Sequence, residues 1–252
     1  MKHTDIRRVF LCADIGTSSL KAALITTEGQ LEAFVREAYP SDQVLCGHIQ
    51  AQAWEAAFRR AVGALYGSSK GKTETAAICI SGNGPTLIPV LKDGHELEPL
   101  HWHDQKVYHL QESTDSHTQQ SLFLPHAAWL LHNRPDLYEQ VRCFFSSQEW
   151  LSWKLGAEAV TSIPAPAYEP VYWDRGQCAV YGLDWEKFPP MVLQGKHIGT
   201  LSATAAAELH GLSAGIPIIA GGPDFITALI GVGAIEEGIV CDRAGTSEGI
   251  NV

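Results

Sequence analysis

The chain has 252 residues, of which 45% are hydrophobic and 18% are charged, and its formal net charge at pH 7 is −10. This length supports a large buried core, and the composition lies away from the low hydrophobicity and high charge of disordered chains. The negative charge argues against broad binding to nucleic acid or to an anionic membrane surface, because both need basic patches. A small molecule is therefore the expected partner.

The cysteines and the N-terminus indicate the compartment. Six cysteines are scattered singly, at positions 12, 46, 79, 143, 178 and 241, and no two of them have the close spacing of a zinc or redox motif. The apolar run after the basic N-terminus is interrupted by Asp14 and is too short for a signal peptide, and no later run would span a membrane. We expect a reduced, cytoplasmic protein.

Three short apolar runs open the chain, over residues 9–13, 20–26 and 31–38, with turn-forming residues between them. They predict a three-stranded antiparallel meander. Residues 50–66 then carry apolar side chains at helical spacing, and residues 76–81 form a buried β-rich run. A meander followed by a helix and a parallel strand predicts an α/β domain with a mixed sheet and flanking helices.

The rest of the chain is less regular until its end. Residues 127–133 and 148–155 predict short helices, and residues 168–174 predict either a strand or a loop. Residues 216–220 then predict a strand, Gly221 and Gly222 a turn, residues 223–231 a helix with a proline in its first turn, and residues 238–242 another strand. Strand, glycine turn and helix in this order present ligands at strand ends in α/β proteins.

The first hairpin contains residues suited to phosphate. Asp14 stands at a strand end, Gly16, Thr17 and Ser18 form the turn behind it, and Lys21 lies on the next strand. A carboxylate there can hold Mg²⁺, directly or through water, while a turn of small residues presents N–H groups and hydroxyls to phosphate oxygens. Taken alone, these residues fit an ordinary hairpin equally well, and a lone lysine is more often a solvated strand residue.

A second Gly-Thr-Ser turn lies near the C-terminus, at Gly245, Thr246 and Ser247, and another strand is predicted after it. A duplicated fold would produce this repeat, and the second copy would then be cut off within its first hairpin. We therefore expect a first domain over residues 1–242 and the start of a truncated second domain over residues 243–252.

Four ordered segments together resemble the FGGY carbohydrate kinases, which belong to the actin, hexokinase and heat-shock-ATPase superfamily. Residues 9–31 resemble the first phosphate motif of the family, residues 78–105 its sugar-facing strand pair, residues 146–174 the helix and loop that follow, and residues 216–252 its Gly-Gly-Gly-Asp segment and second phosphate motif. The resemblance implies a ribonuclease H-like α/β fold and the phosphorylation of a sugar or polyol hydroxyl with ATP and Mg²⁺.

The resemblance also implies roles for individual residues. Asp224 matches the aspartate that accepts the proton of the attacking sugar hydroxyl, and the first turn of a helix favours its carboxylate form. Asn83, Trp102 and Asp104 match positions that line the sugar pocket or its rim. Without the resemblance, Asp224 is a plain helix-start acid and Trp102 a core residue. The implied cofactor-binding residues are Asp14, which also holds the metal, and Gly16, Thr17, Ser18, Lys21, Gly245, Thr246 and Ser247.

The sequence departs from the family pattern in three short places and in length. Gly84 and Pro85 replace a bulky polar or charged pair, Lys106 replaces the arginine that closes a Trp-x-Asp-x-Arg sequence, and Pro223 replaces the third glycine. The sugar or polyol therefore stays unidentified. The C-terminal domain of the family is missing, and catalysis requires two lobes that close over both substrates. We expect weak or no activity from this chain alone. Either the gene product is truncated, or a separate C-terminal kinase domain is its partner, or the half-molecule has another role, and a homodimer is also compatible.

Other functions fit parts of the sequence. The same fold could serve as a non-catalytic sugar- or phosphate-binding fragment or as a regulatory module. A metal-dependent hydrolase could use His101, His103 and Asp104, because His-x-His on a strand places two imidazoles on one face, although no distant residues complete such a site. The sequence has no Walker A lysine loop and no Gly-x-Gly-x-x-Gly turn, which argues against P-loop and Rossmann nucleotide sites.

Overall fold

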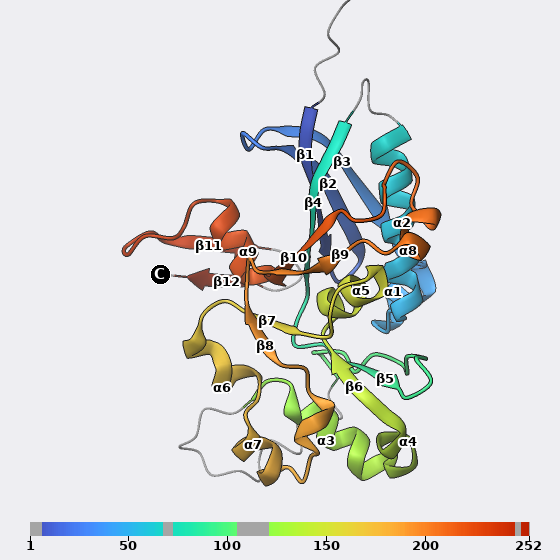
Figure 1. The fold of residues 1–252 in the computed structure, drawn as a ribbon. Coiled ribbons are helices and arrows are strands. Elements are labelled where there is room, and N and C mark those ends of the chain that lie inside the picture. The colour runs from blue at the N-terminus through green and yellow to red at the C-terminus, as the bar shows by residue number, and fades with distance from the viewer. Residues whose placement is uncertain (1–6, 68–72, 105–120, 245–247, 252) are drawn as a thin grey trace, which may run out of the picture.

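The centre of the protein is a six-stranded mixed sheet in the order β3-β2-β1-β4-β10-β9 (Figure 1). The computed structural model describes residues 7–67, 73–104, 121–244 and 248–251. β1, β2 and β3 form the predicted antiparallel meander, whereas β4 runs parallel to β1 and β10 runs parallel to β4. The predicted fold class is confirmed. The strands of this sheet are β1 (Arg7–Ile15), β2 (Ser19–Thr26), β3 (Leu31–Ala38), β4 (Thr73–Gly82), β9 (His197–Thr200) and β10 (Pro217–Pro223).

Helices cover one face of this sheet. The long helix α2 (Ala51–Gly67) packs on β2 and β3, and α5 (Ser147–Leu155) packs on β4 and β10. Strand alternation turns Val9 and Leu11 of β1 toward this face, where they are fully buried with Trp54 and Phe58 of α2. The short helices α1 (Ser41–Cys46) and α8 (Ala203–Glu208) complete the layer (Figure 1). No helix in the described ranges has both the length and the apolar character needed to cross a membrane.

A second hydrophobic core lies below the sheet in Figure 1 and contains most of the middle of the chain. Its centre is a group of stacked and tilted aromatic rings that includes Phe144, Trp173 and Phe188. The elements around it are β5 (Ile88–Leu91), α3 (Leu124–Asn133), α4 (Pro135–Gln140), β6 (Val141–Phe145), β7 (Thr161–Ile163), η2 (Pro166–Tyr168), α6 (Glu169–Tyr172), α7 (Arg175–Val180), η3 (Trp185–Lys187) and β8 (Met191–Leu193).

The C-terminal elements leave the main sheet. Helix α9 (Asp224–Gly231) follows β10, and β11 (Cys241–Ala244) and β12 (Glu248–Asn251) pair as a separate antiparallel hairpin that projects to one side in Figure 1. Strand β11 begins two residues before the predicted domain boundary at residue 243. The division into two domains stays a prediction.

Three expectations about local structure were wrong. Residues 168–174 are mostly helical, as part of η2 and α6, because Pro166 and Pro170 preset the backbone of a first helical turn. Gly221 and Gly222 lie within β10 rather than in a turn. The strand expected at residues 238–242 is shifted to β11.

Gly221 allows β10 to approach β4. A Cβ atom at position 221 would lie 1.7 Å from the carbonyl oxygen of Ile80 on β4. The neighbouring backbone cannot move aside without opening the ladder, so we expect Gly221→Ala to lower the free energy of unfolding by about 3 kcal/mol. Urea unfolding of the two proteins measures this difference.

Gly63→Ala is the matched control. Gly63 lies inside α2, and nothing is within 4 Å of an added Cβ atom. Because glycine in a helix interior is about 0.5–1 kcal/mol less favourable than alanine, this variant should be more stable than the wild type. A Gly221→Ala protein as stable as the wild type would contradict the close approach of β10 to β4.

Candidate functional site

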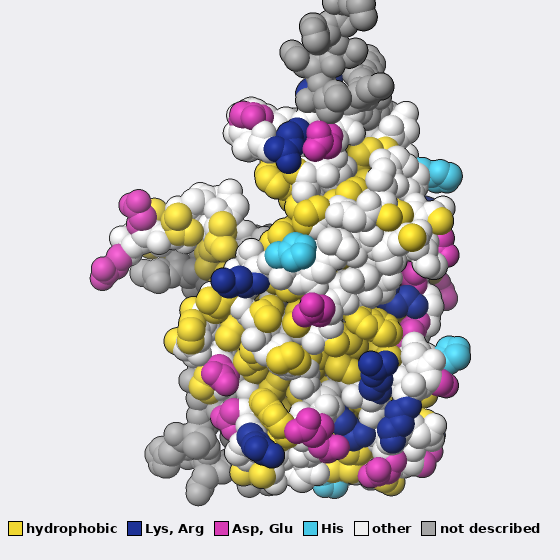
Figure 2. All heavy atoms as spheres, viewed as in Figure 1, with side chains coloured by type: hydrophobic (Ala, Val, Ile, Leu, Met, Phe, Trp, Pro, Cys, Tyr) yellow, Lys and Arg dark blue, Asp and Glu magenta, His cyan; other side chains and the backbone are white. Residues whose placement is uncertain are grey.

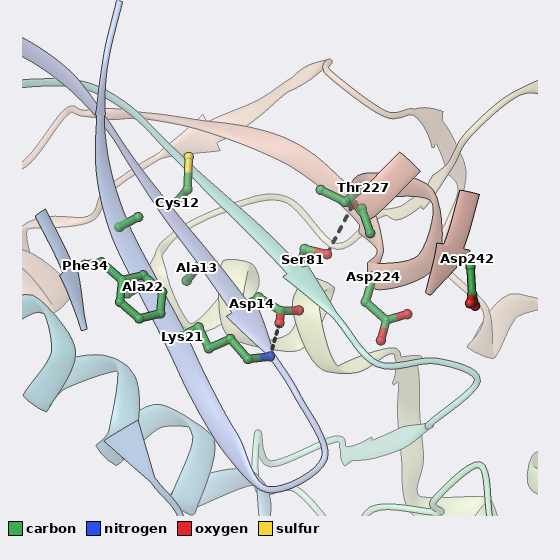
Figure 3. Close-up of a pocket in the computed structure, with 12 residues that line it drawn as sticks. Cys12, Ala13, Asp14, Lys21, Ala22, Phe34, Ser81, Asp224, Thr227 and Asp242 are labelled. Atoms are coloured by element: carbon green, nitrogen blue, oxygen red, sulfur yellow. Dashed lines mark hydrogen bonds and ion pairs between the residues drawn. The ribbon is translucent and has the colours of Figure 1, made fainter. Parts of the chain in front are cut away.

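A cavity of about 620 Å³ lies where β1, β4 and β10 end, beside the start of α9 (Figure 3). Parallel strands bring their carboxyl ends to one edge of the sheet, which is where α/β proteins commonly bind ligands. Asp14 from β1 and Asp224 from α9 both line this cavity, although they are far apart in the sequence. The polar residues of its wall are Asp14, Lys21, Ser81, Asp224, Thr227 and Asp242.

Asp14 and Lys21 form a cross-strand ion pair at one side of the cavity. They are directly opposite in the β1–β2 ladder, and the Lys21 Nζ atom lies 2.9 Å from Asp14 Oδ2. The other carboxylate oxygen, Oδ1, is buried and has no hydrogen-bond partner among the described residues. Burial raises the pKa of the nearby Tyr39 phenol, and the negative charge of Asp14 adds to this effect. The site therefore has one ammonium group and one carboxylate oxygen available for a further contact.

The turn between β1 and β2 is tight. Gly16 donates its N–H to the Ser19 carbonyl oxygen at 3.1 Å, so this N–H closes the turn and is not available to a phosphate. A Cβ atom at position 16 would lie 3.0 Å from that oxygen and 3.2 Å from Lys21 Nζ, which explains the glycine. Thr17 and Ser18 form the half-buried tip of the turn. Of the five predicted residues of this motif, Asp14 and Lys21 line the cavity, Gly16 lies against them, and Thr17 and Ser18 follow in the turn.

The oxygen groups of the cavity suit Mg²⁺. This cation prefers oxygen ligands, and proteins usually hold it through one or two carboxylates together with substrate phosphates and water. Asp14 Oδ1 is an unpaired acceptor of this kind. No group of three or more His, Cys, Asp or Glu side chains in the described part of the chain could hold a metal ion. A Mg²⁺ ion held by Asp14 would take its remaining ligands from phosphate and water oxygens.

Hydrogen bonds fix the start of α9 and therefore the place of Asp224. Ser81 Oγ donates to the Gly222 carbonyl oxygen at 3.0 Å and lies 3.2 Å from Thr227 Oγ1, and Thr227 Oγ1 donates to the Pro223 carbonyl oxygen at 3.0 Å. Pro223 caps the helix with an extended backbone, and Asp224 is its first residue. A carboxylate at this end of a helix is favoured by the helix dipole. Asp224 therefore lines the cavity from the first turn of α9 (Figure 3).

The predicted sugar-side residues are only partly brought to this region. Asn83 follows the end of β4, is nearly buried, and donates its backbone N–H to the Ile15 carbonyl oxygen at 3.0 Å. Trp102 is half-buried, with its ring edge-on to His103. Asp104 lines a different cavity of about 290 Å³, and its carboxylate accepts the backbone N–H of His101. Gly245, Thr246 and Ser247 lie outside the described residues, as do Gln105 and Lys106.

The histidines near Asp104 have structural partners. His101 is buried, its Nε2 atom lies 3.1 Å from the Ile49 carbonyl oxygen, and its ring stacks on that of His103. Burial, with smaller contributions from the neighbouring His103 and His48, lowers the pKa of His101 to about 4. These contacts account for the histidines as packing groups, so no observation favours the hydrolase interpretation.

Sequence reasoning missed Ser81, Thr227 and Asp242 as residues of the cavity wall. Ser81 ends the β-rich run of β4, and a polar residue at the carboxyl end of a predicted parallel strand was a usable signal. Thr227 stands one helical turn after Asp224, which was also visible in the sequence. Asp242 comes from β11, and only the position of this hairpin relative to the sheet brings it near.

A buried polar cluster supports the end of β4 from behind. Ser147 Oγ donates to the Asn83 carbonyl oxygen at 3.3 Å, and a Cβ atom at Gly82 would collide with Ser147 and Gln148. The adjacent Glu149 carboxylate accepts hydrogen bonds from the Ser162 backbone N–H and hydroxyl. Burial raises the pKa of Glu149 to about 7, even though these hydrogen bonds lower it. The cluster fixes α5 against β4 and contains a carboxyl group that titrates near neutral pH.

Glu149 predicts a pH dependence of stability. Its pKa is about 7 in the folded protein and 4.5 ordinarily, so between these pH values the folded protein keeps a proton that the unfolded chain has lost. The free energy of unfolding should therefore fall as the pH rises from 4.5 to 7, by about 3 kcal/mol from this group. We expect Glu149→Gln to remove this part of the fall in urea unfolding measured across that range.

The exposed Glu158, just beyond the same helix, supplies the control. Glu158→Gln should keep the wild-type dependence on pH. Parallel curves for the wild type and Glu149→Gln would show that Glu149 does not titrate in this way.

The chain is similar to known carbohydrate kinases. Residues 9–231 match the model of the FGGY family of carbohydrate kinases, N-terminal domain. The chain is 25% identical to the xylulose kinase of Lactococcus lactis and 22% identical to the autoinducer-2 kinase of Salmonella choleraesuis, over 93% and 97% of its own length. It spans about half of these relatives, 51% of each.

A solved structure gives the same result for the fold. The crystal structure of ligand-bound xylulose kinase from Lactobacillus acidophilus superposes on 96% of the chain with a TM-score of 0.83 at 20% identity, and 54% of that protein is covered. Together with the family match over most of the sequence, it leads to one conclusion: this chain belongs to the FGGY family of carbohydrate kinases.

Proposed function

We propose that this chain forms the acceptor- and phosphate-facing half of an ATP-dependent carbohydrate kinase, which transfers the terminal phosphoryl group of ATP to a hydroxyl of a sugar or polyol. The observation that carries the proposal is that Asp14 and Asp224 line one cavity. Family membership supplies the reaction class, and the names of the relatives, xylulose kinase and autoinducer-2 kinase, support a small polyhydroxylated acceptor.

Asp224 is the general base of this proposal. Its carboxylate accepts the proton of the acceptor hydroxyl as that oxygen attacks the terminal phosphorus of ATP and the bond to ADP breaks. Ser81 and Thr227 position the first turn of α9 and so aim Asp224 into the cavity. Asn83 is retained as an acceptor-side residue because it sits at the carboxyl end of β4. Asp104 lines a separate cavity, so we assign it no role in this proton transfer.

Asp14 and Lys21 act on the phosphates. Asp14 would hold Mg²⁺ together with phosphate oxygens, and the bound ion would neutralise charge on the transferring group. Lys21 supplies a second positive charge to the same side of the cavity. Thr17 and Ser18 offer hydroxyls at the turn tip, and the turn at Gly245, Thr246 and Ser247 is proposed to approach the phosphates from the opposite wall.

A second lobe is the proposed partner of this half. None of the residues of α9 is buried, although the helix is strongly apolar. Val232, Ile235 and Ile250 are 68%, 71% and 70% exposed, and Figure 2 shows hydrophobic side chains on the projecting segment. Grouped exposed apolar residues mark interaction surfaces. Since the relatives are about twice as long, a second lobe of the kind present in them is the partner that fits this surface.

The phosphate role of Asp14 is testable by binding. Asp14→Asn keeps the size of the side chain but removes its charge, and the loss of a charged contact costs about 1.5–3 kcal/mol. We therefore expect Mg·ATP to bind about tenfold to a hundredfold more weakly in isothermal titration calorimetry. Asp93→Asn, at an exposed carboxylate far from the cavity, should leave this affinity unchanged.

The role of Asp224 is testable by turnover. ADP release from Mg·ATP is measured with D-xylulose and a panel of other ketoses, aldonates and polyols, using the chain alone and the chain co-expressed with its downstream coding region. Asp224→Asn should lower acceptor-dependent ADP release by about 10²–10⁴-fold, because proton transfer is lost, with a smaller change in acceptor affinity.

One outcome would refute the role of Asp224, and another would refute the kinase assignment. Undiminished ADP release by Asp224→Asn would exclude this residue as the base. Binding of a sugar without ADP release, under both conditions of expression, would instead favour a non-catalytic binding module of the same fold.

A further inference from the structure

Cys12 and Cys79 are opposite one another on neighbouring strands of the central sheet. Cys12 of β1 pairs with Cys79 of β4 in the parallel ladder, and both thiols are free and partly exposed. Residues paired in this way place their side chains on the same face of the sheet. Of the six cysteines, all of them in described positions, no other two are opposite in a ladder.

This pair of thiols faces the cavity side of the sheet. Cys12 lines the cavity itself, and it lies two residues before Asp14 on β1, so the two side chains share a face. Cys79 lies two residues before Ser81 on β4, so these two side chains also share a face. Figure 3 shows Cys12, Asp14 and Ser81 along this wall. Cys12 is thus reached from the cavity, and Cys79 is partly exposed beside it on the face of the sheet opposite the helix-covered core.

The strand spacing brings the two sulfurs within reach of one bridging atom. Adjacent strands are about 4.8 Å apart, and side chains paired on one face stand at about this separation. A single atom bonded to both sulfurs spans this gap without moving the backbone. Both thiols are free, so the pair is open to a ligand that joins the two sulfurs.

We propose that Cys12 and Cys79 form a dithiol site that binds a soft, thiophilic atom bridging both sulfurs, with trivalent arsenic as the representative ligand. Soft sulfur ligands select soft centres of this class. The dithiol has no role in the proposed phosphotransfer, and this proposal does not depend on that function. A group bound there would stand in the cavity wall directly behind Asp14 and Ser81.

The protonation of the thiols agrees with this choice of ligand. Burial, together with a smaller contribution from the neighbouring Cys12, raises the pKa of Cys79 to about 11, and burial also raises the pKa of Cys12. Reagents that need a thiolate, such as alkylating agents, should therefore react slowly. An arsenic(III) oxide condenses with two thiols: two As–S bonds form, the As–O bond breaks, and the oxygen leaves as water with both thiol protons. Arsenic stays trivalent, so no oxidant is needed.

The test uses phenylarsine oxide and the full chain. The reduced protein is treated with the reagent, excess monothiol then removes any arsenic held by a single sulfur, and intact mass spectrometry counts the groups that remain. We expect one phenylarsenic group per wild-type chain, released by 2,3-dimercaptopropanol. Cys12→Ser and Cys79→Ser should each hold arsenic through one sulfur instead of two. Each variant should therefore bind the phenylarsenic group at least about 100-fold more weakly.

Controls separate the dithiol from the other thiols and from misfolding. Cys143→Ser and Cys241→Ser should each retain the phenylarsenic group, because their partners in the ladders are Val90 and Asn251 rather than cysteines. Cys12→Ala and Cys79→Ala repeat the test with an apolar replacement, and circular dichroism verifies the fold of each variant. Retention by folded variants that lack Cys12 or Cys79, or no retention by the folded wild type, would overturn the proposal.

Discussion

The parallel alignment of β1, β4 and β10 is the constraint on which the candidate site depends. Three strands from distant parts of the sequence end at one edge of the sheet, and the chain then turns into α9 at that edge. Asp14, Ser81 and Asp224 occupy these ends and so meet around one cavity. Disturbing the pairing of β4 with β1 or with β10 would move the two carboxylates apart, even with every residue of the site unchanged.

Close backbone approach maintains this alignment. Gly221 lets β10 lie against the Ile80 carbonyl of β4, and Gly82 makes room for Ser147 and Gln148 at the start of α5. The helix then contributes a buried polar cluster, with Glu149 at its centre, directly behind Asn83. Gly82 and Gly221, which resemble loop residues in the sequence, are thus packing residues at the ends of strands. This packing fixes the positions of the side chains that line the cavity.

The chain belongs to a family whose relatives are about twice as long, and its own surface agrees with that difference. The main sheet has one face covered by helices, whereas α9 and the segment after it carry exposed apolar side chains beside the cavity. A kinase cleft excludes water by closing two lobes over its substrates. The described residues therefore carry the carboxylates of the proposed site, together with an exposed apolar surface beside it.

The sequence by itself determined the meander and α2 from the spacing of their apolar residues, and β4, α5 and α9 from apolar runs and helix-start signals. It singled out Asp14, and through the family resemblance Asp224. It did not determine β5 to β8, which lie around the second core, or β9, a short strand at the edge of the main sheet. Nor did it determine the strand position of Gly221, which looks like a turn until β4 lies beside it. Only the tertiary structure decided that Asp104 lines a separate cavity, and that Ser81, Thr227 and Asp242 join the one shared by the two carboxylates. Local patterns specify which way a side chain points from its own element, but strand order and register specify which side chains meet.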